Sequence, residues 1–437
     1  ERQSLVKELE QKLDLRERLA VLGEDLRVTL DPEALIRWSE RDVLLQNSFV
    51  RWTAAALAAL DLATLILWGI TGTFLPFFAV LFLQIIVMLR FQKRAKAALR
   101  GLDCDPKGLV LFALILEVLE QEEFSSSRLQ EMVSKLKSPG VTAGGAMRRL
   151  ARVVDWLEAR DGLIIQIIDL PVLFTVQLGF AADAWRRRWG SNARAWIDAA
   201  GEVEASLALA TYAYEHPDDP FPVFVETGNS QPLFEGDDLG HPLIPSARCV
   251  RNTVRLGAET RVLLVSGSNM SGKSTLLRVV GVNTVLALAG APVRAKYLRL
   301  APLAVGSSIR VSDSLQDGRS RFYTEILRIR QVFDLAEGGL PVLFLFDELL
   351  EGTNSEDRRV GAEGLIRAFM GRAAVGIITT HDLALTEISK SFEASVRNVH
   401  FQEHIGDGKM TFDYKLRDGV VKTSNALELM RLIGLKV

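Results

Sequence analysis

Eight consecutive residues in the C-terminal half have the types and spacing of a loop that binds phosphate. They are Gly267, Ser268, Asn269, Met270, Ser271, Gly272, Lys273 and Ser274, which fit the pattern G-x-x-x-x-G-K-[ST]. A buried-strand pattern, Val262–Val265, precedes them, and an apolar run of helical character, Thr275–Val285, follows. Glycines let backbone N–H groups wrap an anion, and a helix N-terminus adds its positive end. The pattern therefore predicts a nucleotide site.

Two residues at the end of this loop carry its chemistry. Lys273 would neutralise the β- and γ-phosphates, and the hydroxyl of Ser274 would ligate Mg²⁺. The strand before the loop and the helix after it provide the context that this motif requires. ATP and Mg²⁺ are therefore the expected ligands.

Two further strand patterns end in polar side chains that suit hydrolysis. The apolar run Val342–Phe346 ends in Asp347 and Glu348. Asp347 can hold Mg²⁺ through water, and Glu348 can polarise the attacking water. The run Ile377–Thr380 ends at His381, which can sense the γ-phosphate or orient water; a core histidine is the alternative. An exposed acid pair is the alternative for the carboxylates, and the neighbouring phosphate loop argues against it. We predict an ATPase.

The near balance of charge limits what the chain can bind. Its 437 residues carry 52 basic and 54 acidic side chains, a formal net charge of -2. A globally basic nucleic-acid binder is excluded, so any DNA contact must come from a local patch. The two cysteines, Cys104 and Cys249, argue against a disulfide scaffold and favour an intracellular location. Because the sequence opens at Glu1 within a helical pattern, we expect a fragment of a longer protein.

The sequence divides into four segments by composition and periodicity. Residues 1–52 have helical leucine spacing, 53–96 form a hydrophobic helical hairpin, and 97–215 are mostly helical again. Residues 216–437 alternate short β-rich runs with helices. We expect an α/β fold, with a C-terminal P-loop domain containing a parallel-rich sheet and an all-α region before it.

The hairpin segment contains no Lys or Arg from Thr53 to Leu89. Two apolar runs, Thr53–Ile70 and Phe74–Leu89, flank a short break at 71–73. Each run is slightly shorter than the ~20 residues that comfortably span a bilayer. Basic residues border the pair: Arg51 before it, and Arg90, Lys93, Arg94 and Lys96 after it.

A hairpin with both ends on the cytoplasmic side satisfies the positive-inside rule. We therefore expect membrane association through residues 53–89, with the C-terminal domain in the cytoplasm. A hairpin buried in a soluble core is the alternative. Asp61, Pro76 and Gln84 favour this alternative because polar groups in lipid are costly, whereas the lack of a polar stripe on either helix opposes it.

Several of the C-terminal motifs carry additional, more specific residues. Asn269-Met270 occupies the middle of the phosphate loop, Gly352-Thr353-Asn354 follows the acidic pair, and Thr380 precedes His381. This set resembles the MutS family, closely over residues 235–437. The helical residues 1–215 resemble only loosely the core and lever helices that precede the ATPase in MutS proteins.

The resemblance implies an ABC-type ATPase that forms a homodimer with two composite sites, closed by ATP and opened by hydrolysis. It assigns the loop Gly267–Thr275 to the nucleotide. Residues 317–322 resemble the segment whose serine, here Ser320, reaches across the dimer to the partner's nucleotide. By position, Ile244 would pack near the adenine from one side and Tyr414 from another.

The sequence departs from the family pattern at several points. Ser268 and Ser271 stand where the family usually has proline and glycine, and Glu351 stands near the expected dimer interface where mismatch-repair members usually have arginine. No Phe-x-Glu mismatch-reading element occurs in a plausible context. The hairpin falls roughly where the family inserts its DNA clamp.

The resemblance implies a dimeric, DNA-associated ATP-driven switch in mismatch repair or a related DNA transaction. The departures and the hairpin fit a membrane-associated MutS relative better than a mismatch-reading one. The alternative is a membrane-anchored switch that acts on a protein partner. The ATPase subunit of a transporter fits least, because no segment like Leu-Ser-Gly-Gly-Gln precedes Asp347.

Overall fold

The chain forms two compact units, Gln3–Ala210 and Thr211–Val437. The computed structural model describes residues 1–46, 48–102, 104–138, 141–160, 162, 169–226, 231–309, 321–406 and 409–421. Helix α11 (Ser191–Glu215) runs through the division between the units. The division into four segments at 52, 96 and 215 stays a prediction.

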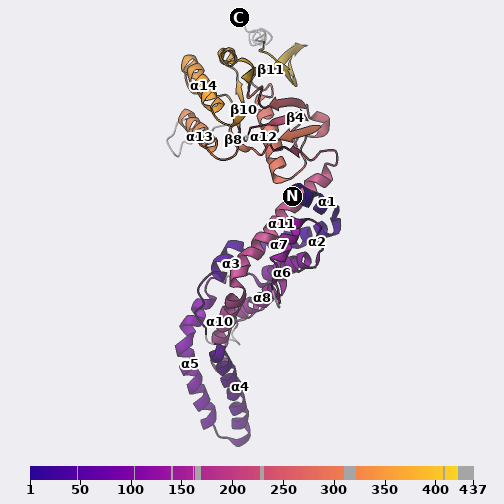
Figure 1. Cartoon of the computed structure of the whole chain (residues 1–437). Coiled ribbons are helices and arrows are strands. Elements are labelled where there is room, and N and C mark those ends of the chain that lie inside the picture. Colours follow the sequence, from indigo (N-terminus) through magenta and orange to yellow (C-terminus); the bar gives the residue numbers. More distant parts are fainter. Residues whose placement is uncertain are drawn as a thin grey trace. The chain divides into compact units, whose positions relative to one another are not determined.

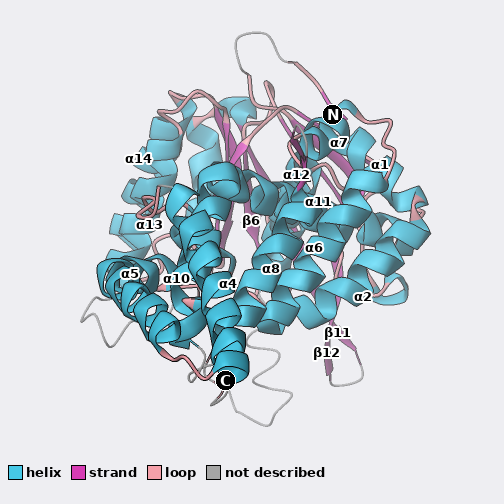
Figure 2. Ribbon diagram, turned by 90° about the horizontal axis from the view of Figure 1, so that it is seen from below, coloured by secondary structure: helices cyan, strands magenta, loops and turns pink. Residues whose placement is uncertain are grey.

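In its described residues, the first unit is helical apart from one pair of short strands, β1 (Lys137–Ser138) with β2 (Val141–Thr142). Helices α6, α8 and α2 pack beside one another in it, as Figure 2 shows. Besides α11, its elements are α1 (Arg2–Gln11), α2 (Leu13–Thr29), α3 (Pro32–Ser39), α4 (Ser48–Thr71), α5 (Leu75–Leu99), α6 (Pro106–Gln121), α7 (Ser127–Ser134), α8 (Ala143–Ala159), α10 (Phe174–Trp185) and η1 (Arg186–Gly190).

Helices α4 and α5 form the hairpin expected from the sequence and run side by side (Figure 1). Both are long and apolar enough to cross a membrane by length and composition. Only 11% of the apolar window in α4 and 6% of that in α5 is buried. The interpretation of this hairpin as the buried core of a soluble domain is therefore wrong, because its apolar side chains face outward.

The second unit contains a six-stranded sheet in the order β12-β11-β6-β10-β9-β8. Neighbouring strands are parallel throughout except for β11 with β12, which are antiparallel. The strands are β6 (Val262–Ser266), β8 (Ala304–Ser308), β9 (Val342–Phe346), β10 (Ala374–Thr380), β11 (Val396–Gly406) and β12 (Lys409–Asp418). A four-stranded sheet, β3-β7-β4-β5, accompanies it: β3 (Val223–Phe224), β4 (Phe234–Leu239), β5 (Asn252–Leu256) and β7 (Tyr297–Leu300). The expected parallel-rich α/β unit is present.

The central strands are apolar on both faces because both faces are covered. One face of β6, represented by Leu263 and Val265, packs in a cluster with α12 (Lys273–Ala289) and the smaller sheet. The other face, with Leu264, packs in a cluster with α13 (Arg321–Leu335) and α14 (Ser355–Met370). Every residue of β6, β9 and β10 is buried, so these strands form the core of the unit.

Gly376 marks the tightest contact between two of these strands. A Cβ added there would lie 2.3 Å from the backbone oxygen and 2.3 Å from Cδ2 of Phe344, its cross-strand partner. We therefore expect Gly376→Ala to lower the free energy of unfolding by about 1–3 kcal/mol, as overpacking does. Urea denaturation measures this change.

Gly364 in α14 is the matched control, because an added Cβ meets nothing within 4 Å. Gly364→Ala should stabilise the protein by roughly 0.5–1 kcal/mol through helix propensity. If both substitutions change the free energy of unfolding equally, the close contact between β9 and β10 does not destabilise an alanine at position 376.

Candidate functional site

The loop between β6 and α12 has a backbone that only certain residues adopt easily. Gly267 has φ 154° and Gly272 has φ 109°. A side chain at Gly267 would also meet Ser271 Oγ at 2.8 Å and the backbone oxygen of Phe401 at 3.2 Å. Met270 takes a left-handed φ of 70°, which is uncommon for a non-glycine residue and often marks a functional loop. The glycines at both ends of the motif therefore have a steric cause.

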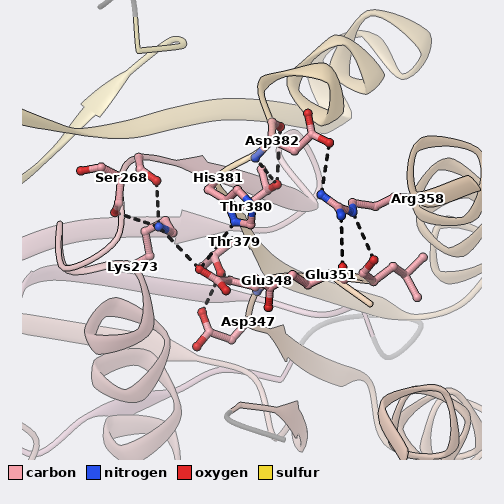
Figure 3. A network of polar contacts seen from close by, with 12 residues as sticks. Ser268, Lys273, Asp347, Glu348, Glu351, Arg358, Thr379, Thr380, His381 and Asp382 are labelled. Carbon is pink, nitrogen blue, oxygen red and sulfur yellow. Dashed lines mark hydrogen bonds and ion pairs between the residues drawn. The ribbon is translucent and has the colours of Figure 1, made fainter. Parts of the chain in front are cut away.

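Lys273 begins α12 and turns its side chain back into the loop (Figure 3). Its Nζ donates to the backbone oxygens of Gly267 at 2.7 Å and Ser268 at 2.9 Å. The side chain is 4% exposed, and Nζ lies 3.9 Å from Glu348 Oε1. Burial lowers the pKa of the Lys273 ammonium, while Glu348, Asp347 and Glu351 act in the opposite direction. A buried cation held by two carbonyls is ready to accept an anion.

Strand register brings the other predicted residues to the same edge of the sheet. In β10, Thr380 lies opposite Ser266 of β6, and Ile378 lies opposite Phe346 of β9. Gly267 therefore follows beside His381, and Asp347 follows beside Thr379, so the residues after the three strands gather at one edge of the sheet. Ligands of open α/β sheets bind at this edge.

Thr379 fixes the acidic pair in place. Its Oγ1 donates to Asp347 Oδ1 at 2.7 Å and accepts from the backbone N–H of Glu348 at 2.9 Å. The N–H of Asp347 donates to the backbone oxygen of Ser308, at the end of β8, at 2.9 Å. The carboxylate of Asp347 and the backbone of the acidic pair are therefore positioned from both neighbouring strands.

Glu348 combines an unusual backbone with a perturbed carboxylate. Its φ is 51°, in the left-handed region, which costs a non-glycine residue of order 1 kcal/mol. Burial and the nearby Glu351 raise the pKa of the Glu348 carboxyl, while Lys273 and His381 lower it. His381 Nδ1 lies 3.7 Å from Glu348 Oε1. A carboxylate with a raised pKa beside a cleft has the properties of a general base.

Arg358, in α14, connects the segment after the acidic pair to the segment after His381 (Figure 3). It donates to the backbone oxygens of Leu350 at 3.1 Å, Glu351 at 3.1 Å and Thr353 at 3.0 Å. Its Nη1 lies 3.2 Å from Asp382 Oδ2. Arg358 therefore holds two strand-end loops in a fixed relation around the site.

A cavity of about 470 Å³ opens beside the loop, a size typical of small-molecule sites. Its lining includes Ile244 and Tyr414, together with Lys273 and Glu348. Further lining residues belong to the phosphate loop and the start of α12: Asn269, Met270, Gly272, Ser274 and Thr275. The cavity therefore has an apolar part and a charged part, as a nucleotide with a base and phosphates requires.

Tyr414 reaches this cavity through the β11–β12 pair. Its φ is 55°, and its ring lies close enough to Gly272 that a Cβ there would meet Cδ1 at 3.2 Å. Asn252 donates to the backbone oxygen of Tyr414 at 3.0 Å and accepts from the N–H of Leu416 at 2.8 Å. The position of the ring is thus set by strands far apart in sequence.

The residues present fit ATP with Mg²⁺. The hydroxyls of Ser268 and Ser271 are buried and have no hydrogen-bond partner among the described residues, so both are free to meet a phosphate oxygen. Ser274 and Asp347 offer the hard oxygen ligands that Mg²⁺ prefers. Ser320 lies outside the described residues, so its role across a dimer stays a prediction from the sequence.

Some site residues were not found by sequence reasoning. Thr379 lies next to the predicted Thr380, and its place at a strand end beside the acidic strand was the available signal. Arg358 had no local signal, because its partners are backbone oxygens and Asp382. Arg248 and Asn252 line the cavity from segments that carry no motif.

Residues 263–436 match the family model described as MutS domain V. This stretch belongs to the MutS family. The chain is 34% identical over 203 residues to "Endonuclease MutS2" of Thermus thermophilus, covering 45% of this chain and 25% of that protein. It is 31% identical over 189 residues to "DNA mismatch repair protein MutS" of Streptococcus uberis, covering 43% of this chain and 22% of that protein. The match thus spans about a quarter of the length of these relatives.

The departures from the usual MutS pattern lie within this site. Ser268 and Ser271 place two additional hydroxyls in the phosphate loop, and both are buried. Glu351 lies close enough to Glu348 to raise its pKa, and their carboxylates with His381 bring ligand-type atoms within 4.8 Å of one another. Glu351 therefore places a second carboxylate beside Glu348.

Proposed function

We propose that the C-terminal unit binds ATP with Mg²⁺ and hydrolyses it. One observation carries the proposal: the buried ammonium of Lys273 and the half-buried carboxylate of Glu348, 3.9 Å apart, both line one cavity. A cation for phosphate and a base for water are what phosphoryl transfer to water requires. The family match over residues 263–436 supports this proposal.

The site's residues divide the work as follows. When ATP binds, the Lys273 ammonium leaves its two loop carbonyl oxygens and binds the β- and γ-phosphate oxygens. Tyr414 and Ile244 flank the adenine. Ser274 and Asp347 would hold Mg²⁺, which would supply charge neutralisation at the phosphates. Glu348 accepts a proton from the water whose oxygen attacks the γ-phosphorus, and the bond to the β–γ bridging oxygen breaks. His381 orients the water or contacts the γ-phosphate.

The raised pKa of Glu348 predicts the acid limb of the activity profile. The base must be ionised, so phosphate release should fall as the pH drops through a pKa above the usual range of a glutamate. Glu351→Gln removes a like charge and should move this limb to lower pH. Initial rates across a pH series measure this shift. If the rate of Glu351→Gln falls at the same acidic pH as that of the wild type, Glu351 does not influence the pKa of Glu348.

We further propose a homodimer with composite sites, from the family resemblance of the segment around Ser320. Subunits carrying Ser320→Ala or Lys273→Ala should each be nearly inactive alone. A mixed dimer keeps one intact site, formed by the Lys273 of the first subunit type and the Ser320 of the second. Mixing should therefore restore about half the activity per mixed dimer. A mixture as inactive as its parents would place Ser320 in its own subunit's site or in none.

Similarity to a DNA mismatch repair protein and to an endonuclease supports DNA as the partner of this switch, in mismatch repair or a related transaction. A membrane-anchored switch acting on a protein is the second candidate, favoured by the exposed apolar faces of α4 and α5. Fluorescence anisotropy with homoduplex, mismatched and branched DNA separates them. Binding to one of these DNA structures supports the DNA-associated switch. If the protein binds none of them, the result supports the membrane-anchored switch.

A further inference from the structure

The outer surface of the α4–α5 hairpin is apolar over most of its length. Leu62, Ile66 and Ile70 of α4 are 60%, 56% and 78% exposed, and Leu75, Phe78 and Phe82 of α5 are 74%, 49% and 65% exposed. They belong to two helices that run side by side and are joined by a short turn at 72–74. Soluble proteins rarely leave an apolar surface of this extent in water.

Three polar side chains in the middle of the hairpin have the opposite orientation. Asp61 and Gln84 are 3% and 0% exposed, and Thr64 is 9% exposed. Gln84 Nε2 donates to the backbone oxygens of Leu57 at 3.3 Å and Pro171 at 2.7 Å, and Thr64 Oγ1 donates to the backbone oxygen of Leu60 at 3.0 Å. A water-soluble amphipathic helix buries its apolar face and exposes its polar one. These two helices do the reverse, which suits a hydrocarbon surrounding.

The base of the hairpin is held by the helical unit. Gly179 of α10 lies so close to α5 that an added Cβ would be 2.6 Å from Ala95 Cβ. Ala54, Ala95 and Phe180 share a buried cluster there. The apolar end is therefore a rigid extension of a folded body rather than a loose segment.

Charge marks where the apolar surface ends. Leu89 is 75% exposed, and the exposed basic residues Arg90, Lys93, Arg94 and Lys96 follow it on α5. From Leu75 to Leu89, at 1.5 Å per residue, α5 extends ~22 Å, less than the ~30 Å hydrocarbon core. Basic residues at this position can meet the phosphates of anionic lipids.

We propose that the α4–α5 hairpin inserts its exposed apolar end into an anionic phospholipid bilayer from one side, as a membrane anchor. The apolar faces contact the acyl chains, the seam of Asp61, Thr64 and Gln84 stays between the helices and the body, and the basic residues meet the headgroups. This inference goes beyond the proposed nucleotide chemistry and does not depend on it.

Vesicle flotation tests the anchor directly. Wild-type chain, purified in mild detergent and diluted into vesicles of phosphatidylcholine with phosphatidylglycerol, should float with the lipid and resist high salt and carbonate. The double variant Ile66→Asp with Phe78→Asp should stay at the bottom of the gradient. Both positions are exposed, so its circular dichroism and melting temperature should match the wild type.

Leu340→Asp is the matched control, because Leu340 is 53% exposed but lies in the second unit. This variant should float like the wild type. Replacing Arg90, Lys93, Arg94 and Lys96 by Gln should reduce recovery on anionic vesicles more than on neutral ones. A wild-type chain that stays soluble without detergent and ignores vesicles would overturn the proposal. A double variant that floats as well as the wild type would also overturn it. If that variant has in addition lost self-association, the apolar surface belongs to a contact with a second copy of the chain.

Discussion

Lys273→Ala is expected to weaken ATP binding by at least ~100-fold, because each charge-assisted hydrogen bond to phosphate is worth about 1.5–3 kcal/mol. The wild-type ammonium is already buried at the start of α12 and held by the backbone oxygens of Gly267 and Ser268. Alanine leaves these oxygens unpaired and removes the cation from the cavity. Equilibrium dialysis or anisotropy with a labelled nucleotide measures the loss.

Lys296→Ala is the matched control for this loss, since Lys296 is an exposed lysine of the same unit. It should bind ATP as the wild type does. Both variants should unfold at similar urea concentrations, which separates a binding defect from a folding defect. Retained affinity in Lys273→Ala, in a folded protein, would remove Lys273 from the phosphate site.

Glu348→Gln is expected to keep ATP affinity and to slow turnover by ~10² or more, the contribution of a positioned general base. Glutamine preserves the size of the side chain and loses only its ability to accept the proton. The backbone N–H at this position still donates to Thr379 Oγ1, so the loop should keep its shape. Single-turnover and steady-state phosphate release, with ATP binding measured in parallel, separate the two effects.

Glu356→Gln controls for a general loss of negative charge, because Glu356 is exposed and pairs with Arg359 in α14. Its turnover should equal that of the wild type. Full turnover in Glu348→Gln would mean that another residue, with His381 the nearest candidate, activates the water.

The parts of the site that the sequence predicted are those encoded in short segments. The phosphate loop, the acidic pair and His381 each follow an apolar strand pattern. β9 and β10 end where their patterns end, and β6 ends one residue beyond its pattern, at Ser266. A local motif needs only its own strand and helix to be recognisable. The parallel-rich α/β unit followed from the same alternation.

The parts that the sequence could not supply depend on contacts between distant segments. The bridge from Thr379 to Asp347 requires the register of β9 with β10, which no single segment encodes. The partners of Arg358 lie on two loops that only the fold brings together. The left-handed φ of Glu348 also has no composition signal.

The hairpin illustrates the same limit. Its sequence fits both a soluble core and a membrane, because apolar helices suit either surrounding. The choice against the soluble core depended on burial, and the windows in α4 and α5 are 11% and 6% buried. The inward orientation of Asp61 and Gln84 reverses the argument that their polarity had made for a soluble core.

The most direct test of the account is phosphate release from ATP by the purified chain, with and without a chelator of Mg²⁺. We expect release that depends on Mg²⁺, falls to background in Lys273→Ala because ATP no longer binds, and falls in Glu348→Gln although ATP still binds. Release by the wild type no faster than by Lys273→Ala, from a folded protein that binds ATP, would contradict it.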